Sequence, residues 1–487
     1  MAKTKTFKPK PRRPRGFEDR GAHVLRAERA LIGAASAVYE RWGFEPLETP
    51  AFEYADALGK FLPDEERPNE GVFAMQDDDE QWMALRYDLT APLARHAAEN
   101  FQNLTKPFRR YQFGEVFRNE KPGPGRFRQF VQCDADSVGA GGAAADAEII
   151  ALASEVMAAA GLSDGEYMIR VNDRRLLDGV LESLGQATPE KRLRVLRAID
   201  KLDRLGRAGV ELLLGEGRKD ESGDFTQGAG LDAAGRNRIL DYLEASGEGR
   251  GDVLRALEPL VGTGEGAGGL DALGEIDAIL SALGVDNSRA VFDPSIVRGL
   301  GYYTGPVFEA ELLATATYDD GSPIQFGSVG GGGRYDDLVA RFTGQAVPAT
   351  GFSFGVSRFA TALSALGRLD SAQTDPLVVV IAAEKDRMAD YFALAHELRA
   401  AGLRAEAFIG GGNMAKQLKY ADKRAASFAV IIGSEEREAG QAQVKDLKLG
   451  AKLAAEIEDN KTWREDQPAQ FTVDRGDIVQ AILARLA

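Results

Sequence analysis

Hydrophobic residues near the N-terminus recur at the spacing of an amphipathic helix. The pattern runs from Leu25 to Trp42, and Gly43 then ends the predicted helix. Thr90 as a cap and Pro92 in the first turn predict another helix over 90–100. Between the helices, shorter runs of apolar and alternating residues predict strands. The strands cover 45–52, 81–87, 108–117 and 127–137, and a further helix covers 144–160.

The middle of the chain has a different pattern. From about Val171 to Val291 it is helical, with glycine-rich breaks at 215–230 and 262–269. We expect this block to form an insertion with a small core of its own. Strand patterns return beyond it, at 291–305, 307–313 and 325–330. Residues 349–366 then predict a strand that continues into a helix.

A boundary is predicted near Leu369 to Pro376, and strands and helices alternate beyond it. The predicted strands are 377–381, 404–408 and 428–432, and the predicted helices are 386–401 and 414–425. This alternation is typical of a small α/β domain with a mostly parallel sheet.

Composition excludes several classes of protein. The chain has 487 residues, of which 44% are hydrophobic and 28% charged, so it is long enough for two to four soluble domains. No run of 18 apolar residues predicts a membrane span, and the N-terminus lacks the apolar stretch of a secretory signal. Cys133 is the single cysteine, which excludes a disulfide within the chain and argues against a zinc site. We therefore expect a cytoplasmic protein without a metal site of its own.

Charge is unevenly distributed along the chain. The net charge of −15 argues against non-specific coating of nucleic acid, although a specific partner needs only a local basic face. The first 20 residues hold eight basic residues against two acidic ones, a local charge of +6. This segment is either a solvated tail or a basic arm that contacts nucleic acid. Alternating Lys and Pro disfavour an amphipathic transit peptide.

Four segments carry candidate chemistry. The hairpin from Phe117 to Phe130 presents three arginines near its turn, which suits a phosphate-rich ligand, although a solvated tip fits equally well. Segment 297–305 places Arg298 among apolar residues and glycines, and 330–336 is a glycine run before Arg334. Segment 351–358 would deliver Arg358 to the start of a helix, where amides and guanidinium bind an anion together. The chain contains neither a Walker-type loop nor the HRD and DFG motifs of kinases.

In this order, the segments resemble the class II aminoacyl-tRNA synthetases, and most closely the histidyl-tRNA synthetase family. The helix before Gly43 and the strand ending at Pro50 are similar to motif 1, segment 117–139 to motif 2, and segment 351–358 to motif 3. RGLGYYTGPVFE (298–309), followed by GGGGRYDDLV (330–339), is similar to the histidine-specific signature. PRG (14–16), LRYDLTAPLAR (85–95) and residues 416–433 also match, the last of these in the C-terminal anticodon-binding domain.

The resemblance implies an α+β catalytic domain built on a mixed, mainly antiparallel sheet. We expect a helical insertion within it and an α/β anticodon-binding domain after it. The expected boundaries are 1–13 for a basic tail, 14–170 and 285–370 for the catalytic domain, 171–284 for the insertion and 376–487 for the anticodon-binding domain.

The resemblance also implies which side chains contact the substrates. Arg298 and Arg118 are the expected catalytic residues. The residues expected to bind ATP are Arg118, Glu120, Arg126, Arg298 and Arg358. The residues expected to bind histidine are Asp88, Leu89, Thr90, Arg118, Gln132, Asp136, Arg298, Tyr302 and Tyr303. Asp136 and Tyr303 are expected to contact the two imidazole nitrogens, of which one donates and the other accepts a hydrogen bond.

The implied activity is the ATP-dependent attachment of L-histidine to tRNA(His) through an adenylate. Mg²⁺ would be bound through the ATP phosphates, and motif 1 implies a homodimer without a membrane partner. The basic cluster Lys416, Lys419, Lys423 and Arg424 either faces tRNA or is a solvated helix face.

Two residues depart from the family pattern. Gly301 stands where an acid is usual, and Ser357 where a glutamate often precedes the motif 3 arginine. The alternatives are an inactive paralogue that senses histidine as a regulatory subunit, a tRNA-sensing module, or a synthetase for another amino acid. The retained signature at 298–303 and the presence of residues 376–487 argue against the first of these.

Overall fold

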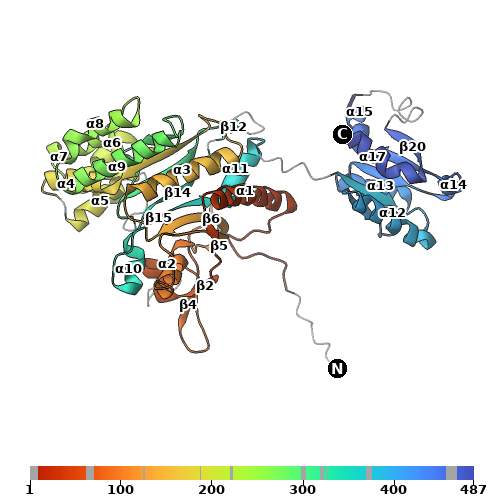
Figure 1. The fold of residues 1–487 in the computed structure, drawn as a ribbon, viewed down its shortest axis with the longest axis horizontal. Coiled ribbons are helices and arrows are strands. Elements are labelled where there is room, and N and C mark those ends of the chain that lie inside the picture. Colours follow the sequence, from red (N-terminus) through yellow and green to blue (C-terminus); the bar gives the residue numbers. More distant parts are fainter. Residues whose placement is uncertain are drawn as a thin grey trace. The chain divides into compact units, whose positions relative to one another are not determined.

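The computed structural model describes residues 9–61, 71–123, 127–186, 188–219, 223–297, 303–317, 323–324, 326–368, 376–456 and 469–486. The chain forms two compact units, Met1–Asp370 and Ser371–Ala487 (Figure 1).

One large sheet organises the first unit. In the described residues it contains eight strands in the order β1-β5-β6-β15-β14-β11-β7-β10. Their bounds are Glu45–Pro46, Phe108–Phe117, Gln129–Val138, Ala349–Gly355, Gly327–Arg334, Pro306–Leu312, Tyr167–Asp173 and Ala290–Phe292. The two outer pairs, β1–β5 and β7–β10, are parallel, and the pairs between them are antiparallel. The predicted mixed, mainly antiparallel sheet is confirmed.

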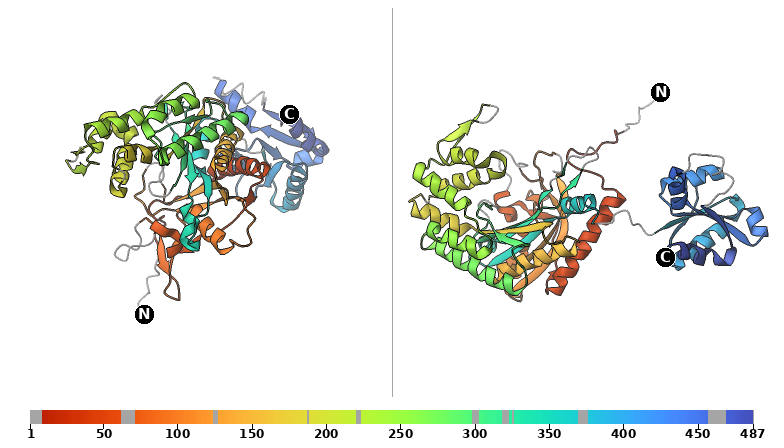
Figure 2. Two further views of the ribbon diagram at one scale, coloured as in Figure 1. Left: turned by 60° about the vertical axis from the view of Figure 1, so that its left-hand side comes forward. Right: turned by 90° about the horizontal axis from the view of Figure 1, so that it is seen from above.

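Helices cover one face of this sheet (Figures 1 and 2). They are α1 (Ala22–Arg41), α3 (Ala143–Ala159), α9 (Glu265–Ala282) and α11 (Val356–Ala365). Side chains alternate between the faces of a strand, so Cys133 and Ala135 of β6 join the core below these helices. Gln132, Asp134 and Asp136 therefore point to the opposite face.

Smaller elements border that opposite face. A sheet in the order β2-β4-β3 consists of Phe52–Tyr54, Trp82–Leu85 and Ala74–Gln76, and the 3-10 helix η1 (Ala55–Phe61) packs beside it. Helix α2 (Thr90–Glu99) packs against α10 (Asp337–Thr343), with Leu93, Tyr335 and Val339 in a shared core. These elements place the chain segments around 85–90 and 335 next to the polar side of β6.

The block between β7 and β10 is helical, as predicted. Its helices are α4 (Arg174–Ser183), α5 (Pro189–Ile199), α6 (Leu202–Leu214), α7 (Ala233–Leu243), α8 (Arg250–Val261) and α9. The glycine-rich break near 215–230 contains a small hairpin, β8 (Gly217–Lys219) with β9 (Phe225–Gln227). The expectation of a separate core was wrong, because the buried residues of α4 to α9 and of the large sheet form one continuous cluster.

The expected strand over 291–305 was also wrong for most of its length. Strand β10 ends at Phe292, and Asp293 accepts bonds from the amide and hydroxyl of Ser295 in a tight turn. Residues 298–302 lie outside the described part of the chain. A short pair, β12 (Ala316–Thr317) with β13 (Pro323–Ile324), follows β11.

The second unit contains its own sheet, in the order β17-β16-β18-β19-β20. These strands are Arg404–Ala407, Leu377–Ile381, Phe428–Ile431, Gln441–Asp446 and Gln470–Asp474. The associated helices are η2 (Lys385–Arg387), α12 (Met388–Ala400), α13 (Met414–Lys423), α14 (Ser434–Glu438), α15 (Leu447–Glu456), η3 (Arg475–Asp477) and α17 (Ile478–Leu486). The first three strands are parallel as expected, but β19 and β20 add antiparallel pairs, so the sheet is mixed. In the described part of the chain, every helix is too short or too polar to cross a bilayer.

Candidate active site

The polar face of β6 is the centre of the site. Register places Asp136 between Arg110 of β5 and Gly351 of β15, and Asp134 between Gln112 and Ser353. Asp134 and Asp136 are almost completely buried, at 1% and 2% exposure. Two carboxylates in an interior position are costly unless cations or hydrogen-bond donors compensate them.

Asp136 receives that compensation from two side chains. Arg110 Nη2 lies 2.9 Å from Asp136 Oδ2, and the Tyr335 hydroxyl donates a short hydrogen bond to Asp136 Oδ1. Burial raises the pKa of Asp136, while Arg110 and Tyr335 oppose that rise. Burial and then the neighbouring Asp136 raise the pKa of Asp134 to about 8, against a smaller opposing effect of Arg110.

Several buried polar atoms on this face have no hydrogen-bond partner among the described residues. They include Gln132 Oε1, Asp134 Oδ1, Asp136 Oδ2, and Nε and Nη1 of Arg110. Asp136 Oδ2 is close to Arg110 Nη2, but the pair lacks hydrogen-bond alignment. Most buried polar groups in proteins are paired, so this concentration is typical of a site that binds a polar ligand.

Glycines form the floor beside Asp136. A Cβ atom on Gly351 would lie 1.9 Å from Asp136 Oδ1, and one on Gly333 would lie 2.8 Å from Cδ1 of the Tyr303 ring. Gly333 pairs with Gly351, which pairs with Asp136, so all three positions share one face. The Asp136 carboxylate therefore lies against Gly351 and the Tyr303 ring against Gly333, on two neighbouring strands about 5 Å apart.

Arg118 directly follows the end of β5 and places a cation there. Its guanidinium carbon lies 4.5 Å from the ring centre of Tyr87 and 5.1 Å from that of Phe130. The Tyr87 hydroxyl donates to Glu120 Oε1 at 2.6 Å, and desolvation raises the pKa of Tyr87 to about 12. Glu120 is exposed, so its carboxylate is open to a ligand.

Arg358 lies in the first turn of α11, directly after β15, as the sequence pattern predicts. It is exposed, and its Nη2 donates to the Phe326 carbonyl at 2.7 Å. The preceding Ser357 donates to Glu28 Oε1 at 2.6 Å and accepts from the Val131 amide at 3.3 Å. Glu28, a buried residue of α1, thus accepts from Ser357 at one carboxylate oxygen and is paired with Arg20 at the other, at 2.8 Å.

Residues 88–90 approach the site at the start of α2. Asp88 Oδ1 accepts from the Ala91 amide at 2.9 Å, which fixes the first turn of the helix. The Leu89 side chain is fully buried, but its carbonyl accepts from Arg110 Nη2 at 3.0 Å. Leu89 can therefore contribute to a ligand site through its position and backbone, and Thr90 begins α2 beside it.

Three predicted residues, Arg126, Arg298 and Tyr302, lie outside the described residues. Arg334, which follows the glycine run, points to the helix-covered side. It donates from Nε and Nη2 to Asp146 Oδ2 at 3.0 and 2.8 Å, and burial raises the pKa of Asp146 to about 6. Arg334 is therefore a structural cation.

Sequence reasoning missed Arg110, Asp134 and Tyr335. Arg110 is one of three cationic or aromatic residues in the run RRY, and only strand register reveals which of them faces Asp136. Tyr335 is two residues beyond the last glycine of the run, on the same strand face as Gly333, so its position next to the glycines was an available signal.

In the second unit, the predicted basic cluster divides into two parts. Lys416, Lys419 and Lys423 are exposed at helical spacing on α13. Arg424 instead makes a two-point contact with Glu406, with nitrogen–oxygen distances of 3.1 and 3.2 Å. The lysines form the accessible basic face, which we call the α13 lysine face.

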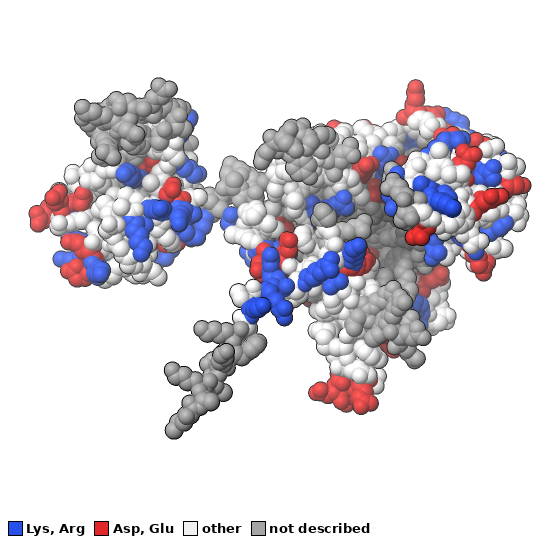
Figure 3. Space-filling view, turned by 180° about the vertical axis from the view of Figure 1, so that it is seen from behind, with Lys and Arg blue, Asp and Glu red and all other residues white. Residues whose placement is uncertain are grey.

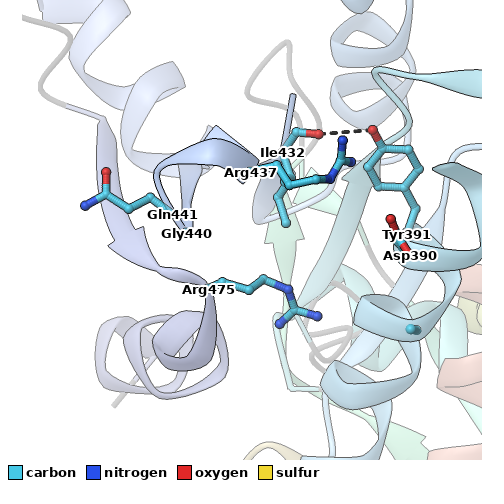
Figure 4. Close-up of a pocket in the computed structure, with 8 residues that line it drawn as sticks. Asp390, Tyr391, Ile432, Arg437, Gly440, Gln441 and Arg475 are labelled. Atoms are coloured by element: carbon cyan, nitrogen blue, oxygen red, sulfur yellow. Dashed lines mark hydrogen bonds between the residues drawn. The ribbon is translucent and has the colours of Figure 1, made fainter. Parts of the chain in front are cut away.

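A hollow of about 300 Å³ also lies in this unit (Figure 4). The side chains of Arg437 and Arg475 line it, but both are already paired. Arg475 contacts both carboxylate oxygens of Glu397 at 2.8 Å, and Arg437 makes a short contact with Glu384. These pairs neutralise the arginines, so the hollow offers little net positive charge to an anion. In the described residues, no group of His, Cys, Asp and Glu side chains could hold a metal ion.

The similarity of this chain to known proteins shows its family. Residues 16–359 match the histidyl-tRNA synthetase family, and residues 377–483 match the anticodon-binding domain family. The chain belongs to the histidyl-tRNA synthetase family. The resemblance seen in the sequence is therefore confirmed for this synthetase and for its C-terminal domain.

Relatives within the family match this chain along nearly its whole length. The histidine–tRNA ligase of Caulobacter vibrioides is 57% identical over 98% of this chain and 97% of its own. The histidine–tRNA ligase of Brucella suis biovar 1 is 55% identical over 98% of this chain and 96% of its own. The crystal structure of histidyl-tRNA synthetase from Nostoc sp. PCC 7120 is 30% identical, with a TM-score of 0.74 over 98% of this chain and all of its own.

Proposed function

We propose that the protein attaches L-histidine to tRNA(His) in two steps, using ATP and releasing AMP and pyrophosphate. The observation that carries the proposal is the buried polar face of Gln132, Asp134 and Asp136 in a chain of this synthetase family. A site with unpaired buried donors and acceptors strongly favours a substrate that pairs with them.

Histidine would lie over the glycine floor. Asp136 and Tyr303 flank that floor and would contact the two imidazole nitrogens, and Tyr302 would line the same pocket. Asp88, Thr90 and Gln132 would hold the α-amino group, with Leu89 setting the backbone beside them. Arg118 and Arg298 would hold the carboxylate.

ATP would lie along the edge defined by β5 and α11. Arg118 and Arg298 would contact the α-phosphate, Arg126 and Arg358 the γ-phosphate, and Glu120 the adenine side. Mg²⁺ would be held through the phosphates of the nucleotide. Mg²⁺, when bound, neutralises charge on the phosphates.

The chemistry then depends on positioning and charge. The histidine carboxylate attacks the α-phosphorus in line, and pyrophosphate leaves. A 3′-terminal ribose hydroxyl of the tRNA then attacks the adenylate carbonyl, and AMP leaves. Arginines around the phosphates stabilise the charge that develops, so the protein need not supply a general base.

The partners follow from the two units. Residues 14–170 and 285–370 would form the catalytic domain, 171–284 the insertion and 376–487 the domain that binds the anticodon.

A homodimer is supported by the apolar outer face of the β2-β4-β3 sheet, where Tyr54, Met83 and Met75 lie in one row and Tyr54 is 56% exposed. We place the enzyme in the cytoplasm, where aminoacyl-tRNA is used.

Pyrophosphate exchange with each of the twenty amino acids tests this proposal. We expect exchange with histidine alone, and Arg298→Ala should abolish it while the circular dichroism spectrum stays unchanged. No exchange with histidine, or robust exchange with another amino acid, would refute the proposed function.

A further inference from the structure

The segment before the catalytic unit forms a short basic arm, residues 9–15. Lys10, Arg12, Arg13 and Arg15 are all exposed, and the arm contains no acidic residue. Figure 3 shows Lys and Arg side chains gathered where this arm meets the catalytic unit. Within the described residues, Arg13 has an ion pair, with Asp19 at 3.9 Å, and both partners are well exposed. Such a pair is weak, so the arm keeps most of its charge available.

The arm is stiff. Pro9, Pro11 and Pro14 fix their own φ angles and restrict the preceding residues to extended conformations. Residues 14–17 form a turn, closed by the Phe17 amide and the Pro14 carbonyl at 3.2 Å, and five residues of extended polyproline-type chain before it, 10–14, cover about 16 Å. A stiff arm loses little conformational entropy when it binds, so its charges act on a partner at low cost.

The arm is also anchored at a defined place. The Arg128 amide donates to the Gly16 carbonyl at 2.8 Å, and the Arg118 amide donates to the Arg128 carbonyl at 2.9 Å. The Phe17 ring packs against Phe73 at 5.7 Å between centroids. The arm therefore leaves the protein directly beside the turn that follows Arg118.

We propose that this arm binds the phosphate backbone of the tRNA acceptor arm. The inference rests on the proposed function, since the 3′ end of the tRNA must reach the adenylate beside the same turn. The net charge of −15 repels RNA, so a local cationic arm is needed most where the acceptor end approaches. Exposed guanidinium and ammonium groups whose ion pairing is at most weak suit phosphates rather than bases, so the contact would not depend on the RNA sequence.

Direct binding of an acceptor minihelix tests the proposal without catalysis. A fluorescent acceptor-stem RNA of the tRNA, lacking the anticodon arm, is titrated with full-length protein at several salt concentrations. The test variant is Lys10→Ser/Arg12→Ser/Arg13→Ser, which leaves Arg15 and the anchor at Gly16 intact. The matched control, Lys385→Ser/Arg399→Ser/Lys448→Ser, removes the same charge from exposed positions of the C-terminal unit.

We expect the arm variant to bind the minihelix about tenfold more weakly. The slope of the logarithm of the binding constant against the logarithm of salt concentration should become shallower by roughly two to three. The control variant should match the wild type. Histidine-dependent exchange should be equal in all three proteins. Unchanged minihelix affinity in the arm variant would overturn the inference, as would an equal loss in the control. Failure of the proposed function would instead appear as absent exchange in the wild type, which minihelix binding does not require.

Discussion

Arg110 and Asp136 face each other across β5 and β6, with Nη2 and Oδ2 2.9 Å apart and neither side chain open to solvent. Arg110 also donates to the Leu89 carbonyl, so one guanidinium joins the predicted imidazole ligand to the start of α2. The pair therefore links the floor of the site to the segment that is expected to hold the amino group.

Removing the cation should destabilise the catalytic unit. Arg110→Met leaves a buried carboxylate without its partner, which costs about 3–5 kcal/mol in comparable proteins. The loss should appear in urea unfolding at pH 8. Arg110→Met/Asp136→Asn should recover part of the free energy of unfolding, because the unpaired charge is then absent. Equal stability of Arg110→Met and the wild type would contradict this account of the pair.

Tyr335→Phe should weaken histidine binding alone. The variant removes the hydroxyl that donates to Asp136, so the carboxylate can reorient. We expect the KM for histidine in pyrophosphate exchange to rise about tenfold, equivalent to ~1.4 kcal/mol, with the KM for ATP unchanged. Tyr87→Phe is the matched control, because that hydroxyl contacts Glu120, and it should affect ATP. Loss of ATP binding in Tyr335→Phe would count against the assigned roles.

The stability of the catalytic unit should depend on pH through Asp134. Its folded pKa of about 8 lies above the ordinary value of about 3.9, so the folded state holds its proton more tightly. Stability therefore falls as pH rises between these two values. Asp134→Asn cannot ionise and should gain about 1–3 kcal/mol relative to the wild type between pH 5.5 and 8.5. Exposed Asp78→Asn should leave the pH profile parallel to the wild type.

Restoring the family's usual glutamate at position 357 should be harmful here. Ser357→Glu would bring a second carboxylate to Glu28, which is 3% exposed and bonded to the serine hydroxyl. Arg20 already pairs with Glu28, but a second carboxylate beside it in an interior position should still lower the free energy of unfolding by about 2–3 kcal/mol. Ser357→Ala should lose only about 1 kcal/mol, the value of one hydrogen bond. Ser357→Glu/Glu28→Ala should recover stability, and a failure to do so would sink the explanation.

The α13 lysine face should matter for tRNA and not for adenylation. Lys416→Glu/Lys419→Glu/Lys423→Glu should raise the KM for tRNA roughly tenfold by adding repulsion of the phosphates. Pyrophosphate exchange, which uses no tRNA, is the internal control. Arg424→Gln should have a smaller effect, because Glu406 already neutralises that guanidinium. An unchanged KM for tRNA would identify the lysines as a solvated helix face.

Local patterns were sufficient to predict many elements of the fold. Strand patterns at 108–117 and 127–137 predicted β5 and β6, the second with bounds one or two residues early, and the strand-to-helix junction at Gly355 was visible around Arg358. The family resemblance supplied the order of the large domains. These features depend on residues close together in sequence, where periodicity and turn chemistry act.

The rest depends on contacts between distant segments. Three contacts join separate elements: the ion pair of Arg110 with Asp136, the hydrogen bond from Tyr335 to Asp136, and the hydrogen bond from Ser357 to Glu28. The helical block packs onto the large sheet because its apolar residues meet it in space, although glycine-rich breaks suggested independence. Sequence spacing also could not distinguish Arg334, held by Asp146, from an arginine open to a ligand.

The glycine floor imposes a direction on the evolution of this pocket. Gly351 has no side chain that could be shortened, and any addition there meets Asp136 within 1.9 Å. Point substitutions in the floor can therefore make the pocket shallower but never deeper. Any enlargement of the pocket must therefore come from its walls, such as Asp136 and Tyr335, which are already hydrogen-bonded to each other.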